Sequence, residues 1–292
     1  YTGSLEAFRF AYDVVYTNVQ AAGAYRGYGA TQGIFAVESA VSELADILGI
    51  DAVKMREMNM LREGMVMPAY YGEKTNSCAL DRCMERCSEL FDWDAKSQVR
   101  TMPDGKIRTA GVAMAMQGSS ISNVDVGSAT VTLGDDGCYT LAIGAADMGT
   151  GCDTILSQMV AECMDCDIDD VFVAPVDTDS SPYDSGSYAS STTYVTGKAV
   201  MLACDKLKNQ LCEIAGEMLS CPPDEIEFCG STLKCLSDGS TVTLRDLSYK
   251  AQCNNEIAVR ATATHSSPVS PPPFMVGMVE IELDPETGSV EI

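Results

Sequence analysis

The chain has 292 residues, 46% of them hydrophobic and 21% charged, a balance that excludes a disordered protein and favours roughly two domains or two lobes of one. The 42 Asp and Glu against 19 Lys and Arg give a formal net charge of −23, which argues against nucleic-acid and anionic-membrane partners. We interpret most of this excess as a solvated acidic surface. The sequence has neither an apolar run long enough to span a membrane nor a secretory signal pattern.

The cysteine content is high and odd, with 13 residues scattered through a chain of ordinary size. A small disulfide-stapled secreted fold looks different, so we expect reduced thiols and a cytoplasmic protein. The pairs Cys163/Cys166 and Cys83/Cys87 lack the second pair that a zinc or iron–sulfur site needs, and we interpret them as buried or incidental.

The first part of the chain predicts a strand, a turn and three helices. Phe8, Phe10, Tyr12 and Val14 alternate at period two, which indicates a half-buried strand through Asn18. After a Gly- and Ala-rich turn at residues 21–30, spacings of three and four predict a helix with one apolar stripe, formed by Ile34, Val37, Val41, Leu44 and Leu48. We expect Gly49 to end this helix, Asp51 to cap a second one, and residues 79–91 to form an amphipathic third.

The rest of the chain mixes short strands with helices. Runs separated by Gly-Asp turns predict strands at 111–116, 129–133 and 139–143, then a helix over 152–166 and a buried strand over 171–173. A polar loop at 177–193 precedes a helix over 197–219. A small strand-and-turn module over 221–250, a Pro-rich linker at 268–273 and a last strand at 275–283 follow.

These elements predict a mixed α+β fold with two lobes. We expect residues 1–110 to form the first lobe, residues 111–270 the second, and residues 271–292 a strand that returns to the first.

Three Gly-rich polar loops stand at or just before predicted helices, at residues 24–29 (AYRGYG), 148–154 (MGTGCDT) and 185–193 (SGSYASSTT). Helix N-termini expose backbone N–H groups and a partial positive charge, so such loops predict binding of an oxyanion or a dinucleotide. Ordinary surface loops are an equally good reading of these residues. None of the loops has the P-loop or the dinucleotide-binding glycine pattern.

Nucleophilic and zinc catalysis have little support. His265 is the only histidine and lies before the Pro-rich linker, so we interpret it as a surface or structural residue. A Ser-His-Asp or Cys-His arrangement would depend on this one residue.

In order and content, the loops resemble segments of the molybdenum hydroxylases, the xanthine dehydrogenase and aldehyde oxidoreductase superfamily. Residues 24–33 resemble the segment AFRGFGxxQ, residues 147–151 resemble EMGQG, and residues 177–197 resemble DTDxxPxxxG followed by SRxTYVTG. The resemblance extends from about Phe10 to Val290 and implies the two-lobe molybdopterin-binding fold of this superfamily.

The resemblance also implies a cofactor and partners. Molybdenum would be held by a pterin dithiolene, as molybdopterin cytosine dinucleotide, and not by protein side chains; its sulfido or selenido ligand stays open. The family hydroxylates a carbon beside a ring nitrogen, or an aldehyde carbon, with oxygen from water. Electrons leave through [2Fe-2S] clusters to FAD, which implies iron–sulfur and FAD subunits and another molybdopterin-binding subunit or lobe as partners.

Site residues are carried over position by position. The substrate pocket is expected to include Tyr12, Tyr25, Tyr28 and Ser119. The cofactor is expected to contact three groups of residues, which are Ala24, Tyr25 and Arg26; Gln117 and Gly118; and Gly149, Thr150, Gly151, Ser187, Tyr188, Ala189, Ser190, Ser191 and Thr192. Core packing is the alternative for Tyr12 and Tyr25.

The chain departs from the family pattern at three points. Thr150 stands where the family usually has Gln, and Ser191 where it often has Arg, so cofactor contacts there would be rearranged. The catalytic glutamate of the family lies in a GVGE segment beyond the position of Ile292, so we assign no catalytic residue to this chain. We expect a fragment or one piece of a split subunit.

Four possible functions stay open. The first is hydroxylation of an N-heteroaromatic ring, nicotinate or a purine, because Tyr28 and Tyr25 offer stacking surfaces and a split, Cys-rich chain resembles the bacterial nicotinate dehydrogenase. Aldehyde oxidation is the alternative reaction. A non-catalytic assembly subunit, or an unrelated hydrolase that uses His265, are the alternatives from other classes.

Overall fold

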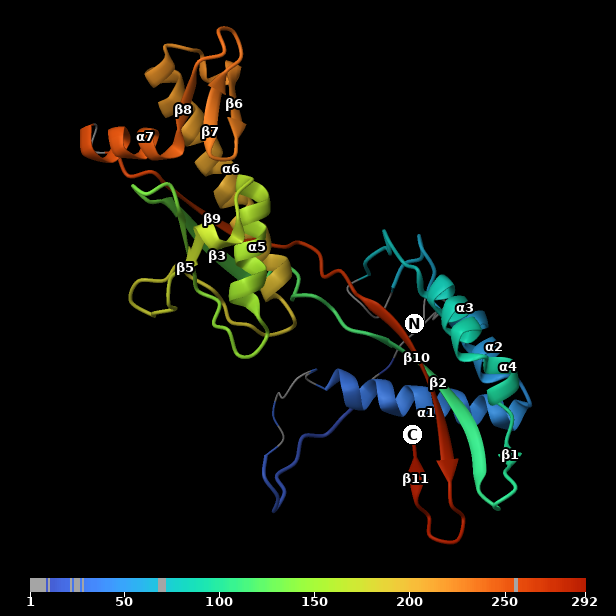
Figure 1. Cartoon of the computed structure of the whole chain (residues 1–292). Coiled ribbons are helices and arrows are strands. Elements are labelled where there is room, and N and C mark those ends of the chain that lie inside the picture. Colours follow the sequence, from blue (N-terminus) through green and yellow to red (C-terminus); the bar gives the residue numbers. More distant parts are fainter. Residues whose placement is uncertain are drawn as a thin grey trace. The chain divides into compact units, whose positions relative to one another are not determined.

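The computed structural model describes residues 9, 11–21, 23, 27, 29–67, 72–254 and 257–292. They form two compact units, unit 1 with residues 1–117 and 272–292 and unit 2 with residues 118–271 (Figure 1). The first unit therefore extends beyond the expected end at residue 110. The reason is that the strand expected to open the second lobe pairs instead with the returning strand near the C-terminus.

Unit 1 combines four helices with a sheet among its described residues. The helices are α1 (Ala30–Leu48), α2 (Ala52–Asn59), α3 (Leu80–Phe91) and α4 (Trp93–Lys96). The sheet has the order β1-β2-β10-β11, with β1 at Arg100–Thr101, β2 at Ile107–Met116, β10 at Phe274–Leu283 and β11 at Val290–Glu291. Strands β2 and β10 are antiparallel along their whole length, and one face of the pair packs on α3. The buried side chains include Leu80, Met84, Trp93, Val112 and Met114.

The helix boundaries follow local signals. Gly49 caps α1 in the left-handed conformation, at φ 62°, which favours a residue without Cβ. The Asp51 carboxylate accepts a hydrogen bond of 2.9 Å from the Lys54 N–H and so caps α2. Both predictions are confirmed.

The predicted apolar stripe of α1 is wrong. Val37, Leu44 and Leu48 are exposed, and the fully buried positions are Glu38 and Ala45. The reason is a buried ion pair, because Arg56 of α2 donates from Nε to Glu38 Oε2 at 2.8 Å and has essentially no exposed surface. A polar residue therefore defines the inward face of α1.

The strand predicted before this helix is absent from the described residues. Residues 11–17 adopt no regular structure, and Tyr12 and Val14 are exposed. Phe8 and Phe10 lie outside the described residues. An alternating pattern needs a neighbouring strand to pair with, and none is described beside this segment.

Unit 2 has a sheet of order β5-β4-β3-β9, with β3 at Val126–Leu133, β4 at Tyr139–Ile143, β5 at Val171–Val173 and β9 at Arg260–Ser266. Helix α5 (Cys152–Met164), the 3₁₀ turn η1 (Ile168–Asp170) and helix α6 (Thr192–Leu219) connect and cover these strands. Helix α6 packs on β3 and β9, and α5 lies between α6 and β5. The predicted strands at 139–143 and 171–173 are confirmed with the predicted bounds, and those at 111–116, 129–133 and 275–283 are confirmed but begin earlier.

A small module follows α6. It contains η2 (Pro223–Glu225), a sheet of β6 (Ile226–Cys229), β7 (Thr232–Cys235) and β8 (Thr241–Thr243), then α7 (Leu244–Tyr249) and the π-helical turn η3 (Lys250–Asn254). The strands and turns are confirmed. Helix α7 and strand β9, which carries His265, are not among the predicted elements.

Two further expectations need correction. Helix α6 begins at Thr192 and not at residue 197, because Val195 N–H already donates to Ser191 O at 2.7 Å. The expectation that all cysteines are thiols is wrong, because Cys221 and Cys235 form a disulfide while the other cysteines, all in described ranges, are free. Among the described helices, none combines the length and the apolar character needed to cross a bilayer.

Candidate functional site

Helices α5 and α6 lie side by side and run in the same direction (Figure 1). A Cβ on Gly197, one turn into α6, would lie 3.7 Å from Leu156, one turn into α5. Two turns later, the thiols of Cys204 and Cys163 lie within hydrogen-bonding reach. Because the contacts advance together along both helices, their N-termini lie at the same end of unit 2. The loops at 147–151 and 185–191, which lead into these helices, therefore share this end.

A third predicted segment joins the same end. The backbone N–H of Ser120 donates to the carbonyl of Ala189 at 2.8 Å. Beside it, the N–H of Ser119 donates to the carbonyl of Pro271 at 3.2 Å. The structure thus brings together Gly118 and Ser119 with Ser187 to Thr192, all of which were predicted as site residues.

The backbone of this region is strained. Ala189 and Ser190 are successive non-glycine residues in the left-handed region, at φ 50° and 57°, and Ser120 has φ 79°. Each such residue costs about 1–3 kcal/mol unless its surroundings enforce the conformation. Strain of this kind gathers at ligand-binding loops, and here it falls on two of the predicted segments.

Asp184 enforces the conformation of the strained loop. Its Oδ1 accepts from Gly186 N–H at 2.8 Å, and its Oδ2 accepts from the hydroxyl of Thr196, in α6, at 2.9 Å. The loop also lies directly on the end of β4, because a Cβ on Gly144 would come within 2.3 Å of the carbonyl oxygen of Pro182. The loop is therefore fastened at both of its ends.

The loop before α5 is closed by its own carboxylate. Asp147 Oδ1 accepts from the N–H groups of Gly149, Thr150 and Gly151 at 2.8, 3.0 and 3.2 Å. Hydrogen bonds from the backbone, that of Gly149 first, hold the pKa of Asp147 below its usual value. The anion that these amides bind in the structure is thus a side chain of the same chain.

The first turn of α6 is different. No hydrogen bond among the described residues uses the N–H groups of Thr192, Thr193 or Tyr194, and no side chain caps the helix. The sequence has no Lys or Arg between Arg108 and Lys198, so backbone dipoles and hydroxyls are the groups that this segment offers to an anion. These groups fit a polar, anionic ligand held by many neutral donors.

From the closed loop follows a first prediction, for Asp147→Ala. The amides of residues 149–151 should exchange with deuterium about tenfold faster, because they lose their common acceptor. Because the pKa of Asp147 is lowered in the folded chain, the protection is present above the usual aspartate pKa and is lost as pH falls through the folded value. Hydrogen exchange measured by mass spectrometry against pH tests this. Asp147→Asn, which keeps an acceptor oxygen, is the control, and equal exchange in all three proteins would contradict the assignment.

The remaining predicted site residues do not lie at this end of unit 2 in the described part of the chain. Ala24, Tyr25, Arg26 and Tyr28 lie outside the described residues. Tyr12 and Gln117 belong to unit 1, where Tyr12 is exposed. The roles of all six stay predictions.

A cleft in unit 1 does not coincide with these loops. It has a volume of about 700 Å³, lies in unit 1, and is lined by residues of α2 and α3 such as Glu57, Met60, Arg82 and Glu85, together with Trp93. None of the predicted site residues lines it. We place the candidate site at the loops that lead into α5 and α6. The loop before α6 has strained backbone, is held in place by Asp184, and precedes backbone N–H groups that have no acceptor among the described residues.

Metal ligation by side chains has little support. Among the described residues, the groupings of His, Cys, Asp and Glu close enough for a metal are Asp147/Cys152/Asp153 and Cys221/Glu225/Cys235. In the first, Cys152 is buried and Asp147 is exposed and already engaged by backbone amides. Neither grouping includes Cys83, Cys87, Cys163 or Cys166.

Asp147, Asp184 and Ser120 are residues that the sequence analysis did not assign to the site. For the two aspartates a signal was available, because Asp two residues before Gly favours a turn in which the side chain accepts backbone N–H groups. Ser120 gave no local signal, since its partner Ala189 is distant in sequence.

The chain is similar to known proteins over most of its length. Residues 4–60 and 86–292 match two molybdopterin cofactor-binding domain families. The probable hypoxanthine oxidase XdhD of Escherichia coli K12 is 30% identical over 295 residues, covering 97% of this chain and 30% of that protein. The putative xanthine dehydrogenase molybdenum-binding subunit XdhA of the same organism is 32% identical over 286 residues, covering 95% of this chain and 38% of that protein.

The fold has close counterparts. Quinoline 2-oxidoreductase from Pseudomonas putida 86 superposes with a TM-score of 0.77 at 20% identity, over 92% of this chain and 37% of that one. The chain thus spans about a third of the length of the relatives that it matches. The family matches cover most of its residues, and the chain therefore belongs to the molybdopterin cofactor-binding domain family of the molybdenum hydroxylases.

Proposed function

We propose that the chain is a molybdopterin-binding part of a multi-subunit molybdenum hydroxylase. Its reaction is the hydroxylation of an N-heteroaromatic ring, nicotinate or a purine. The observation that carries the proposal is the meeting of three predicted cofactor segments at the shared N-terminal end of α5 and α6.

Relatives with purine activities in their names, a probable hypoxanthine oxidase and a putative xanthine dehydrogenase subunit, favour ring substrates. A 6-hydroxypseudooxynicotine dehydrogenase subunit from Paenarthrobacter nicotinovorans, 25% identical over 301 residues, is a further relative named for a nitrogenous substrate. Tyr28 and Tyr25 are the residues of this chain that we propose stack on such a ring.

The residues present fit a molybdenum–pterin dinucleotide. When bound, this group supplies the metal centre that transfers an oxygen atom derived from water to the substrate carbon. The free amides of Thr192 to Tyr194 and the hydroxyls of Ser187 and Ser190 would hold its anionic part. The backbone amides of the loop at 149–151 are engaged by Asp147, so this loop would line the cofactor site with its backbone and offer the Thr150 hydroxyl as a hydrogen-bond donor.

Other parts of the machinery would come from partners. We propose an iron–sulfur subunit, an FAD subunit and the remaining molybdopterin-binding polypeptide, with cytosine dinucleotide as the cofactor form. No glutamate of this chain is assigned as the base, because the family segment GVGE is absent from the sequence.

Metal and nucleotide analysis of the assembly tests the proposal. The chain, purified from its source with the polypeptides that accompany it, should contain molybdenum in about stoichiometric amount and release cytidine monophosphate on acid hydrolysis. Steady-state turnover should be faster on nicotinate or xanthine than on an aldehyde. Faster turnover on the aldehyde would favour the aldehyde oxidoreductase alternative, and a complex without molybdenum would favour the assembly subunit.

A second prediction concerns Arg26→Ala in the same assembly. The change removes the cation of the 24–29 loop, so molybdenum content should fall severalfold while the melting temperature stays unchanged. The control is His265→Ala. Its metal content should stay normal, because His265 lies in β9, paired with Gly127, and not in any of the predicted cofactor segments. Full molybdenum occupancy in Arg26→Ala would contradict the assignment of this loop.

A further inference from the structure

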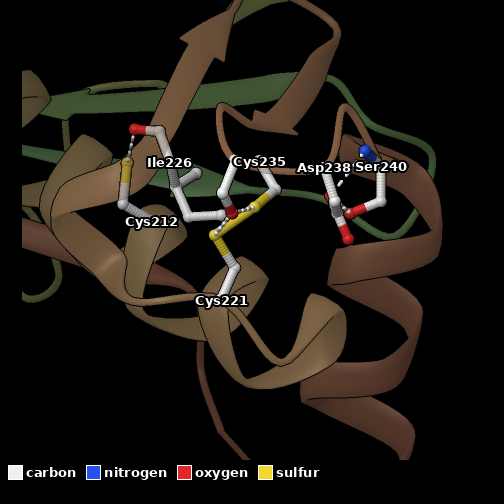
Figure 2. The surroundings of a disulfide bond; sticks show 7 residues. Cys212, Cys221, Ile226, Cys235, Asp238 and Ser240 are labelled. Carbon is white, nitrogen blue, oxygen red and sulfur yellow. Dashed lines mark hydrogen bonds between the residues drawn. A yellow bond between two sulfur atoms is a disulfide. The ribbon is translucent and has the colours of Figure 1, made fainter.

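The disulfide between Cys221 and Cys235 joins two elements of unit 2. Cys221 directly follows Ser220, which caps the C-terminus of α6, and Cys235 is the last residue of β7. Their Cα atoms are 6.3 Å apart, within the usual range for a disulfide. Figure 2 shows the bond crossing from the end of the helix to the strand. It therefore fastens the β6–β8 module to α6.

The neighbouring thiol of Cys212 is poorly suited to exchange with this bond. Burial raises the pKa of Cys212, whose thiol donates to the carbonyl of Ile226 beside the disulfide. Because the thiolate is the attacking form, a protonated Cys212 does not compete for either sulfur, and the pairing of Cys221 with Cys235 is kept.

The two sulfurs differ in access and surroundings. Both cysteines are buried, with Cys221 7% and Cys235 1% exposed, so Cys221 is the more accessible of the two to a small thiol. The Ser237 hydroxyl lies 3.0 Å from Cys235 Sγ and 3.9 Å from Cys221 Sγ, so it can donate to Cys235 as a leaving thiolate. This arrangement favours attack of the incoming thiol on Cys221, with Cys235 as the leaving group.

We propose that Cys221 and Cys235 are a site of reversible oxidation that exchanges with low-molecular-weight thiols. A thiolate attacks Cys221 Sγ and forms a mixed disulfide with it, while the bond to Cys235 breaks and Cys235 leaves as a thiolate that Ser237 stabilises and that then takes up a proton. A second small thiolate attacks the small-molecule sulfur of the mixed disulfide, forms the small disulfide and releases Cys221 as a thiolate, which takes up a proton. One protein disulfide and two small thiols thus give two protein thiols and one small disulfide, and oxidation is the reverse. This site is independent of the proposed function.

The consequence of reduction is local. The bond closes a loop with a sequence separation of 14 residues, and loss of such a cross-link favours opening of the loop by roughly 100-fold. The module over residues 226–243 should therefore loosen while strand β3, which is hydrogen-bonded to β4 on one side and to β9 on the other, stays closed.

The test titrates the full chain in glutathione buffers of varied reduced to oxidised ratio. Alkylation and mass spectrometry should show Cys221 and Cys235 changing together and reversibly, and amide exchange in residues 226–243 should rise roughly 100-fold on reduction. Cys212→Ser should behave as wild type, Cys221→Ser should exchange as the reduced form in every buffer, and Ser237→Ala should be reduced about tenfold more slowly.

Three results would overturn the proposal. Both cysteines could remain alkylatable in oxidised glutathione, or reduction could leave the exchange of residues 226–243 unchanged. The reduced chain could also retain a stoichiometric metal that Cys221→Ser loses, which would make Cys221, Glu225 and Cys235 metal ligands instead.

Discussion

Gly144→Ala should release the 182–191 loop and empty the candidate site. A Cβ at this position would lie 2.3 Å from Pro182 O and 3.0 Å from Asp184 N, both backbone atoms that move only if the loop moves. Overpacking of this kind costs about 1–3 kcal/mol. Because Asp184 fixes the loop to Thr196, its displacement should also disturb the first turn of α6, and molybdenum content should fall.

Thermal denaturation and metal analysis of the purified assembly measure the two effects. Gly111→Ala is the matched control, because Gly111 lies in strand β2 and a Cβ there would meet no atom within 4 Å. The control should keep its molybdenum and its stability within about 1 kcal/mol. Wild-type stability and metal content in Gly144→Ala would show that the loop is not seated on the end of β4.

Arg56→Met should destabilise unit 1 by about 3–5 kcal/mol, because it leaves the buried carboxylate of Glu38 without its cation. Arg56 also donates to the carbonyl of Ala52 at 2.9 Å and to the hydroxyl of Ser42 at 2.9 Å, so the arginine links α1 with α2. The carboxylate in turn accepts from Met114 N–H of β2 at 3.0 Å. Removal of the cation therefore affects both helices and the sheet.

Urea denaturation followed by fluorescence measures this loss, since Trp93, the only tryptophan, is buried in the core of unit 1. The double variant Glu38→Gln with Arg56→Met should recover most of the stability, because a neutral amide still accepts from Met114 N–H. Lys54→Ala, which removes an exposed ion pair with Glu57, should cost at most about 1 kcal/mol. Equal losses for Lys54→Ala and Arg56→Met would contradict the role given to the buried pair.

Sequence patterns predicted the features that depend on neighbours along the chain. Gly49 ends α1 and Asp51 caps α2 as expected, because capping involves residues within one helical turn. The loops before α5 and α6 were found for the same reason, as Gly and hydroxyl residues act on their own backbone. The order of these loops along the chain was also enough to indicate the family to which the chain belongs.

Tertiary structure decided the features whose partners are distant in sequence. The inward face of α1 is set by Arg56, which no apolar periodicity encodes, and the pairing of Cys221 with Cys235 among 13 cysteines depends on where β7 lies beside α6. The contact between Ser120 and Ala189 likewise exists only once β3 and α6 are packed. The physical reason is that a local hydrogen bond needs only the right residue nearby in the chain, whereas a distant contact forms only after the packed core has placed both partners.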